Sequence, residues 1–122
     1  MPTILVVDDD QQIRAWLRQI LESKGYEVEE ASDGKEALVI CERVKPALVV
    51  LDIFMPNMDG LEFILHNRSG PQSAKVLVLS GNLVNGYRMC QTARVFGAHD
   101  ALDKPFSAEE FIRRVETLFS KT

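Results

Sequence analysis

Four consecutive apolar residues, Leu48 to Leu51, constrain the fold of this chain more than any other feature. A strand with one face in solvent alternates apolar and polar residues, whereas this run is apolar at every position. The run, within a predicted strand at 47–51, therefore indicates a central parallel strand covered by helices on both faces. Further short runs rich in β-branched or apolar residues predict strands at 4–7, 28–31, 76–79 and, more weakly, 100–102.

Segments of helical period separate these strands, at residues 13–21, 37–44, 61–67, 85–96 and 111–119. Their ends carry the expected residues. Asp10, Asp33 and Ser107 stand at predicted N-caps, the last two with a Glu three residues later, and Gly25 and Gly97 stand at predicted C-termini. The alternation predicts an α/β fold, a (βα)₅ doubly wound, five-stranded parallel sheet with right-handed crossovers.

Length and composition limit the functions open to the chain. Its 122 residues, 46% of them hydrophobic, suffice for one domain, which we expect to span residues 1–122. The formal charge is 14 − 18 = −4 with no cationic cluster, which argues against direct binding to nucleic acid. No apolar run approaches the roughly 20 residues of a membrane span, so we expect a cytoplasmic protein. Cys41 and Cys90 lack partners at metal-ligand spacing and are interpreted as reduced core residues.

Chemically active residues follow four of the five predicted strands. Asp8 and Asp9 follow the first strand, Asp52 the third, Ser80 the fourth and Lys104 the fifth. The carboxyl ends of parallel strands meet at one edge of a sheet, where open α/β folds bind ligands. Carboxylates gathered there repel one another unless a cation neutralises them, and such oxygen ligands suit Mg²⁺. A lysine and a hydroxyl beside them indicate a phosphoryl group.

Some of these residue types have simpler interpretations. Asp10 is best interpreted as the N-cap of the first helix, and Ser80 alone could be an ordinary turn hydroxyl. His66 and His99 have no partner at ligand spacing and are interpreted as structural or solvated. For Asp52 a capping role is unconvincing, because Asp59 is better placed to cap the helix that follows.

Four motifs in sequence order carry a resemblance that covers essentially the whole chain. They are VVDDD at 6–10, LDIFMPNMDG at 51–60, VLSG at 78–81 and DKPF at 103–106. Together they resemble the receiver domain of bacterial two-component response regulators. The resemblance implies a flavodoxin-like strand order of 2-1-3-4-5, which sets the first and third strands side by side. It also implies a cis peptide bond between Lys104 and Pro105.

The resemblance also implies roles for individual residues. Asp52 would be the phosphoacceptor, and Asp8, Asp9 and Asp52 would bind Mg²⁺ together with the backbone carbonyl of Phe54. Ser80 and Lys104 would bind the phosphoryl oxygens. The donor would be the phosphohistidine of a histidine kinase or phosphotransfer protein, or a small phosphodonor.

The resemblance leaves several points open. The output partner is unknown, a weak homodimer is one further partner to consider, and the chain would be a signalling protein, not an enzyme in the usual sense. The sequence fits a stand-alone receiver, and an excised receiver of a longer regulator or hybrid kinase would look the same.

Three alternative functions remain to be weighed. A phosphohydrolase with an aspartyl-phosphate would need an acid two residues after Asp52, where this chain has Phe54. A flavodoxin-like phosphate binder would need amide and hydroxyl donors where Asp8, Asp9 and Asp10 stand. The third alternative is a receiver fold that only binds partners and is never phosphorylated.

The region expected to pass the phosphorylation signal to a partner differs from that of many receivers. Those receivers carry an aromatic residue where this chain has Ala101. Alanine has no side-chain rotamer, so a ring that turns inward is excluded at this position. The glycine-containing stretch 81–86 has few strong helix formers. We therefore expect phosphorylation to be read out by movement of this stretch and the start of the following helix, where Tyr87 is a candidate aromatic substitute.

Overall fold

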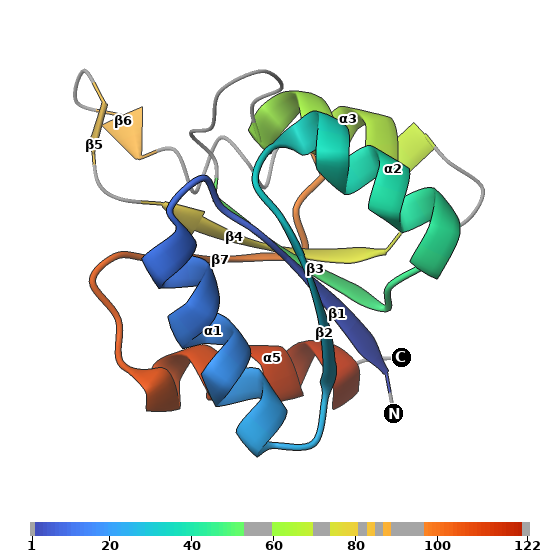
Figure 1. Cartoon of the computed structure of the whole chain (residues 1–122). Helices are drawn as coiled ribbons and strands as arrows, with labels where there is room; N and C mark the ends of the chain where they lie inside the picture. Colours follow the sequence, from blue (N-terminus) through green and yellow to red (C-terminus); the bar gives the residue numbers. More distant parts are fainter. Residues whose placement is uncertain are drawn as a thin grey trace.

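A five-stranded parallel sheet forms the centre of the protein (Figure 1). The computed structural model describes residues 2–52, 60–69, 74–80, 83–84, 87–88 and 97–120. The sheet contains β1 (Thr3–Val7), β2 (Glu27–Ala31), β3 (Leu48–Asp52), β4 (Lys75–Ser80) and β7 (Asp100–Asp103). Their spatial order is β2-β1-β3-β4-β7, and every neighbouring pair is parallel. Counted along this sheet the order is 2-1-3-4-5, which confirms the predicted flavodoxin-like α/β fold.

Helices cover both faces of the sheet. The helices are α1 (Gln11–Ser23), α2 (Gly34–Val44), α3 (Gly60–Ser69) and α5 (Ala108–Ser120). Alternate residues of each strand point to opposite faces. Val50 therefore packs in a core with α1 and α5, whereas Val49 and Leu51 pack in a second core with α2 and α3. All four residues of the Leu48 to Leu51 run are fully buried, as the sequence predicts for a strand covered on both faces.

The predicted helix ends are found where the structure describes them. Asp10 and Asp33 cap α1 and α2 by accepting backbone N–H groups, and Ser107 Oγ accepts the N–H of Glu110 in the first turn of α5. Gly25, after α1, has a φ of 90°, the left-handed conformation that glycine adopts without steric cost. Among the described residues, no helix is long and apolar enough to cross a membrane.

The region after β4 differs from the sequence prediction. A helix was expected from about Asn85 to Phe96, but Tyr87–Arg88 forms β6, which pairs antiparallel with β5 (Leu83–Val84). Val84 pairs with Tyr87, so only Asn85 and Gly86 connect the two strands. Asn-Gly between two short runs is a strong hairpin signal, and the sequence prediction gave it too little weight. Residues 81–82, 85–86 and 89–96 lie outside the described part of the chain, and with them most of the expected helix, Cys90 and most of the stretch expected to rearrange.

Strand register brings the carboxyl ends of the strands level with one another. Val7 of β1 lies opposite Leu51 of β3, and Asp52 lies opposite Leu79 of β4. Ser80 in turn lies opposite Asp103 of β7. Consequently, the residues immediately after β1 and β7 and at the ends of β3 and β4 all reach the same edge of the sheet.

Candidate functional site

Two buried carboxylates mark the carboxyl edge of the sheet. Asp8 follows β1 and is 1% exposed, and Asp52 ends β3 and is 8% exposed. The N–H of Asp8 donates to the carbonyl of Ala31 at 3.1 Å, so pairing with β2 continues one residue past the strand. β1 and β3 are neighbours in the sheet, and this adjacency sets the two carboxylates close together.

Lys104, which directly follows β7, reaches these carboxylates. Its N–H donates to the carbonyl of Ser80 at 2.7 Å, which holds the residue beside the end of β4. Its Nζ lies 3.7 Å from Asp8 Oδ2 and 3.9 Å from Asp52 Oδ2. The lysine is therefore close enough to both carboxylates to contact one group bound between them. The predicted cis peptide between Lys104 and Pro105 is confirmed.

Asp8, Asp9 and Asp52 form a set of oxygen atoms suited to a divalent cation. Each offers one carboxylate oxygen, and these oxygens lie within 4.8 Å of one another. Asp8 Oδ1 accepts the N–H of Asp10 at 2.9 Å, whereas Asp8 Oδ2 is buried and has no hydrogen-bond partner among the residues that the structure describes. A buried carboxylate oxygen in this state is costly unless a cation or proton compensates it. The donor set of hard oxygens, one of them left open, fits Mg²⁺.

The electrostatics of Asp8 agree with this geometry. Burial raises the pKa of Asp8 from 3.8 to about 6, the hydrogen bond from the Asp10 backbone opposes that rise, and the charge of Asp52 adds to it. Lys104 lowers the pKa and Asp9 raises it further. In the absence of a cation, the ionised form of Asp8 is therefore less favourable here than in a solvated carboxylate.

Ser80 shares this edge of the sheet. It ends β4, and within the described part of the chain its Oγ is, like Asp8 Oδ2, a buried side-chain oxygen without a hydrogen-bond partner. A buried hydroxyl normally finds a partner, so an open Oγ at a strand end suits contact with a bound group. Phe54, whose carbonyl was predicted to be a metal ligand, lies outside the described residues, as does Asp59.

A family comparison agrees with the fold. The profile of the response regulator receiver domain family matches residues 4–116. The chain belongs to this family. The resemblance drawn from the four motifs is thereby confirmed, and this protein is a receiver domain of the two-component type.

Individual relatives resemble this receiver over nearly its whole length. Over 119 residues the receiver is 42% identical to the response regulator MprA of Mycolicibacterium vanbaalenii, covering 98% of this chain and 51% of that protein. It therefore spans about half the length of the curated relatives it matches. The chemotaxis protein CheY4 of Vibrio cholerae superposes with a TM-score of 0.87 at 32% identity, covering 96% of this chain and 98% of CheY4.

A third relative is the signal receiver domain of a signal transduction histidine kinase from Syntrophus aciditrophicus. It superposes with a TM-score of 0.89 at 26% identity, covering 100% of this chain and 95% of that domain. The same receiver fold thus occurs in a chemotaxis protein and in a domain of a histidine kinase.

Sequence reasoning missed two charged residues beside the site of this receiver. Arg14 of α1 donates through Nη1 to the carbonyl of Asp8 at 2.6 Å and through Nε to Glu30 Oε1 at 3.1 Å. Glu30 lies near the end of β2, beside β1. An acidic residue within a strand that helices should cover was the available signal, because such a charge needs a partner.

Cys41, His99 and His66 were interpreted from the sequence as core, structural or solvated residues, and their positions in the structure agree with this. Cys41 is a half-buried free thiol packed against the core, and burial raises its pKa to about 11, so it is unreactive at neutral pH. His99 Nδ1 accepts the N–H of Val76 at 3.0 Å at the opposite, amino-terminal end of β4, which is a structural contact. His66 is exposed on α3.

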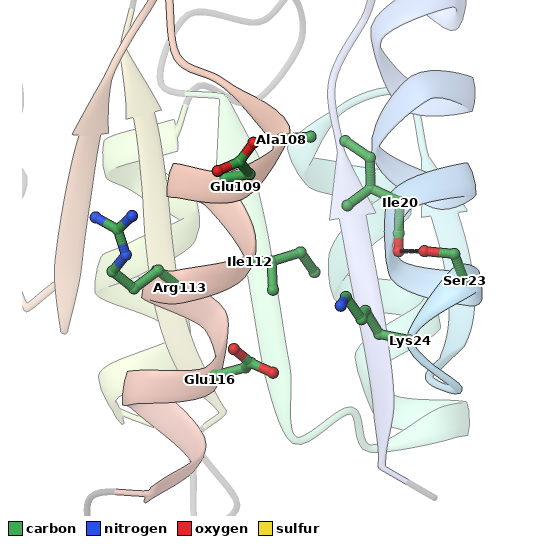
Figure 2. Close-up of a pocket in the computed structure, with 8 residues that line it drawn as sticks. All are labelled: Ile20, Ser23, Lys24, Ala108, Glu109, Ile112, Arg113 and Glu116. Carbon is green, nitrogen blue, oxygen red and sulfur yellow. Dashed lines mark hydrogen bonds between the residues drawn. The ribbon is translucent and has the colours of Figure 1, made fainter.

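A groove of about 380 Å³ between α1 and α5 is separate from this site (Figure 2). Its lining residues are Ile20, Ser23, Lys24, Ala108, Glu109, Ile112, Arg113 and Glu116. Figure 2 shows Ile112 directed toward α1 and Arg113 extending the other way. The lining contains none of the strand-end residues, so the groove takes no part in their chemistry.

Replacing Asp8 with Asn should stabilise the protein at neutral pH in metal-free buffer. Because its folded-state pKa is raised, Asp8 contributes stability that is fully present below pH 3.8 and is lost as pH rises through about 6. A shift of this size corresponds to on the order of 3 kcal/mol. The free energy of unfolding, measured by urea denaturation at several pH values, should therefore be higher for Asp8→Asn at pH 7.5, and the difference should shrink between pH 6 and pH 4.

The control for this measurement is Glu42→Gln, which removes an exposed carboxylate of α2. It should change the free energy of unfolding by less than about 0.5 kcal/mol at every pH. A pH-independent difference between Asp8→Asn and the wild type would contradict the assignment of a raised pKa to Asp8.

Proposed function

We propose that this receiver accepts a phosphoryl group on Asp52 in a Mg²⁺-dependent reaction. The observation that carries the proposal is the position of Lys104 Nζ, within 3.9 Å of Asp52 Oδ2 and 3.7 Å of Asp8 Oδ2. A lysine shared by two buried carboxylates is placed to contact an anion attached to one of them. The open Oγ of Ser80 at the same edge supports this arrangement.

The proposed reaction is an in-line displacement at phosphorus. An oxygen of Asp52 forms the new bond to phosphorus while the bond to the imidazole nitrogen of a phosphohistidine breaks, and the electron pair of that bond stays on the nitrogen. Lys104 Nζ and Ser80 Oγ contact the phosphoryl oxygens as negative charge spreads over them. Water later hydrolyses the acyl phosphate on Asp52. The domain therefore catalyses only its own modification.

Asp8, Asp9 and Asp52 are the proposed ligands of Mg²⁺, with the carbonyl of Phe54, which lies outside the described residues. When bound, Mg²⁺ supplies positive charge that neutralises these carboxylates and the incoming phosphoryl oxygens. Asp8 holds one oxygen open for this purpose while its other oxygen is fixed by the Asp10 amide. Asp9 is exposed and completes the acidic pair from the solvent side.

The biological setting follows from family membership. The proposed donor is a histidine kinase or phosphotransfer protein, with a small phosphodonor as a substitute, and phosphorylation would change the affinity for an output partner or a second copy of the chain. We propose that residues 1–122 act as a single cytoplasmic receiver domain without direct contact to nucleic acid. A role in partner binding alone is less favoured, because it gives no use to the buried carboxylates and Lys104.

Intact mass spectrometry after incubation with acetyl phosphate and Mg²⁺ tests the proposal. The wild type should gain one phosphoryl group, because the small donor needs only the residues of the site. Asp52→Asn, and the wild type with excess EDTA, should gain none. Glu42→Gln, which changes an exposed carboxylate of α2, should behave as the wild type. A phosphoryl adduct on Asp52→Asn would disprove the assignment, and its absence from the wild type would favour a purely partner-binding receiver.

Replacing Lys104 with Gln should slow phosphorylation by acetyl phosphate about 100-fold, since removing one donor to a developing anion costs this order of rate. Mg²⁺ should bind at least as tightly as to the wild type, because a cation beside Asp8 and Asp52 has been removed. Phosphorylation rates and Mg²⁺ titrations of the same samples measure both effects. Lys35→Gln, on the exposed start of α2, is the control. Equal rates for Lys104→Gln and Lys35→Gln would remove Lys104 from the mechanism.

A further inference from the structure

Arg14 connects helix α1 to the loop that carries the acidic pair. Its Nη1 donates to the carbonyl oxygen of Asp8 at 2.6 Å, and its Nε donates to Glu30 Oε1 at 3.1 Å. The arginine side chain is 16% exposed, so most of it is withdrawn from solvent. From these contacts we propose that Arg14, held in place by Glu30, is a positioning residue that aims Asp8 and Asp9 at the metal. The inference rests on the Mg²⁺ site of the proposed function.

The hydrogen bonds of Asp8 show what remains for the metal. Its N–H donates to Ala31, its carbonyl accepts from Arg14, and its Oδ1 accepts from the Asp10 amide. Oδ2 is the remaining polar atom of Asp8, and it is the buried oxygen that faces Lys104 Nζ. Arg14 thus helps fix a residue whose one open oxygen is the proposed ligand.

The carbonyl of Asp8 also determines the direction of Asp9. The peptide unit is planar, so the Asp8 carbonyl and the N–H and Cα of Asp9 move together. Because Asp9 is exposed, its carboxylate depends on the backbone for its orientation. A donor that fixes the Asp8 carbonyl therefore fixes the point from which the Asp9 carboxylate approaches the metal.

Glu30 holds the guanidinium of Arg14 in place. Its other oxygen accepts from Arg18 Nη1 at 2.7 Å, and Arg18 also pairs with Glu22. The hydrogen bond from Arg18, together with the one from Arg14, holds the pKa of Glu30 below its ordinary range. Partly exposed ion pairs of this kind contribute little to stability. The main consequence of the network is therefore the geometry of Arg14.

A role of Arg14 as a nearby charge and a role as a positioning residue predict opposite changes in Mg²⁺ affinity when Arg14 is replaced. If Arg14 acted only as a nearby cation, Arg14→Gln would tighten Mg²⁺ binding by removing repulsion. If it positions the acidic pair, the same substitution leaves the Asp8 carbonyl without its side-chain donor, and Mg²⁺ binds more weakly. The sign of the change in Mg²⁺ affinity separates the two roles.

The test is isothermal titration calorimetry of the full chain with MgCl₂, at a temperature where thermal unfolding curves show every variant to be folded. The dissociation constant of Arg14→Gln should rise about 10-fold, as expected when a residue that orients a metal ligand is lost. Glu30→Gln, which leaves Arg14 in place but weakens its support, should give a smaller rise. The matched control is Arg18→Gln, which removes the same charge from the same network without touching Asp8.

Four results would overturn the inference. The first is an unchanged or tighter affinity in Arg14→Gln. The second is an equal loss of affinity in Arg18→Gln, because the Asp8 carbonyl would then not be the cause. The third is an absence of Mg²⁺ binding to the wild type, which would remove the metal site of the proposed function as well. If Arg14→Gln does not fold, affinity equal to the wild type in Glu30→Gln also overturns the inference.

Discussion

The crowding of carboxylates at the end of an apolar sheet is the constraint on which the rest of this structure depends. Asp8 and Asp52 are buried, and together with Asp9 they offer oxygens within 4.8 Å of one another. Burying like charges is unfavourable, and Lys104, nearly 4 Å from each buried carboxylate, offsets only part of that cost. The raised pKa of Asp8 is the residual effect. Positive charge placed at these carboxylates would lower that cost, which is the physical basis for the proposed use of Mg²⁺.

The fold keeps these charges together by surrounding them with rigid elements. β1 and β3 are adjacent central strands with both faces covered, so the positions of Asp8 and Asp52 follow from the packing of Val50, Leu51 and their neighbours. Lys104 is tied through its backbone to β4. A hydrogen bond from Arg14 of α1 to the Asp8 carbonyl, and one from the Asp8 N–H to Ala31 of β2, then fix the loop after β1. The packing that buries the core thus also brings the carboxylates together at the strand ends.

The sequence predicted most of this arrangement because its signals are local. The apolar run at 48–51 and the alternation of strands and helices are sufficient for the fold class, and the rule that strand ends share one edge locates Asp8, Asp52 and Lys104. Strand order came from the family resemblance, since periodicity carries no information about it. Tyr87 was wrongly placed in a helix, and the contact of Arg14 with the Asp8 carbonyl was not foreseen. The acidic residue in β2 signals that a charged partner is needed, but the contact with the Asp8 carbonyl depends on how α1 packs against the loop.

The most direct test of the account is a crystal structure of the protein with Mg²⁺ and beryllofluoride, a stable mimic of the phosphoryl group. The account predicts beryllium bonded to a carboxylate oxygen of Asp52, with fluorides in contact with Lys104 Nζ and Ser80 Oγ. It predicts Mg²⁺ bound by oxygens of Asp8, Asp9 and Asp52. Beryllofluoride on another residue, or Lys104 Nζ and Ser80 Oγ both out of contact with it, would contradict the account.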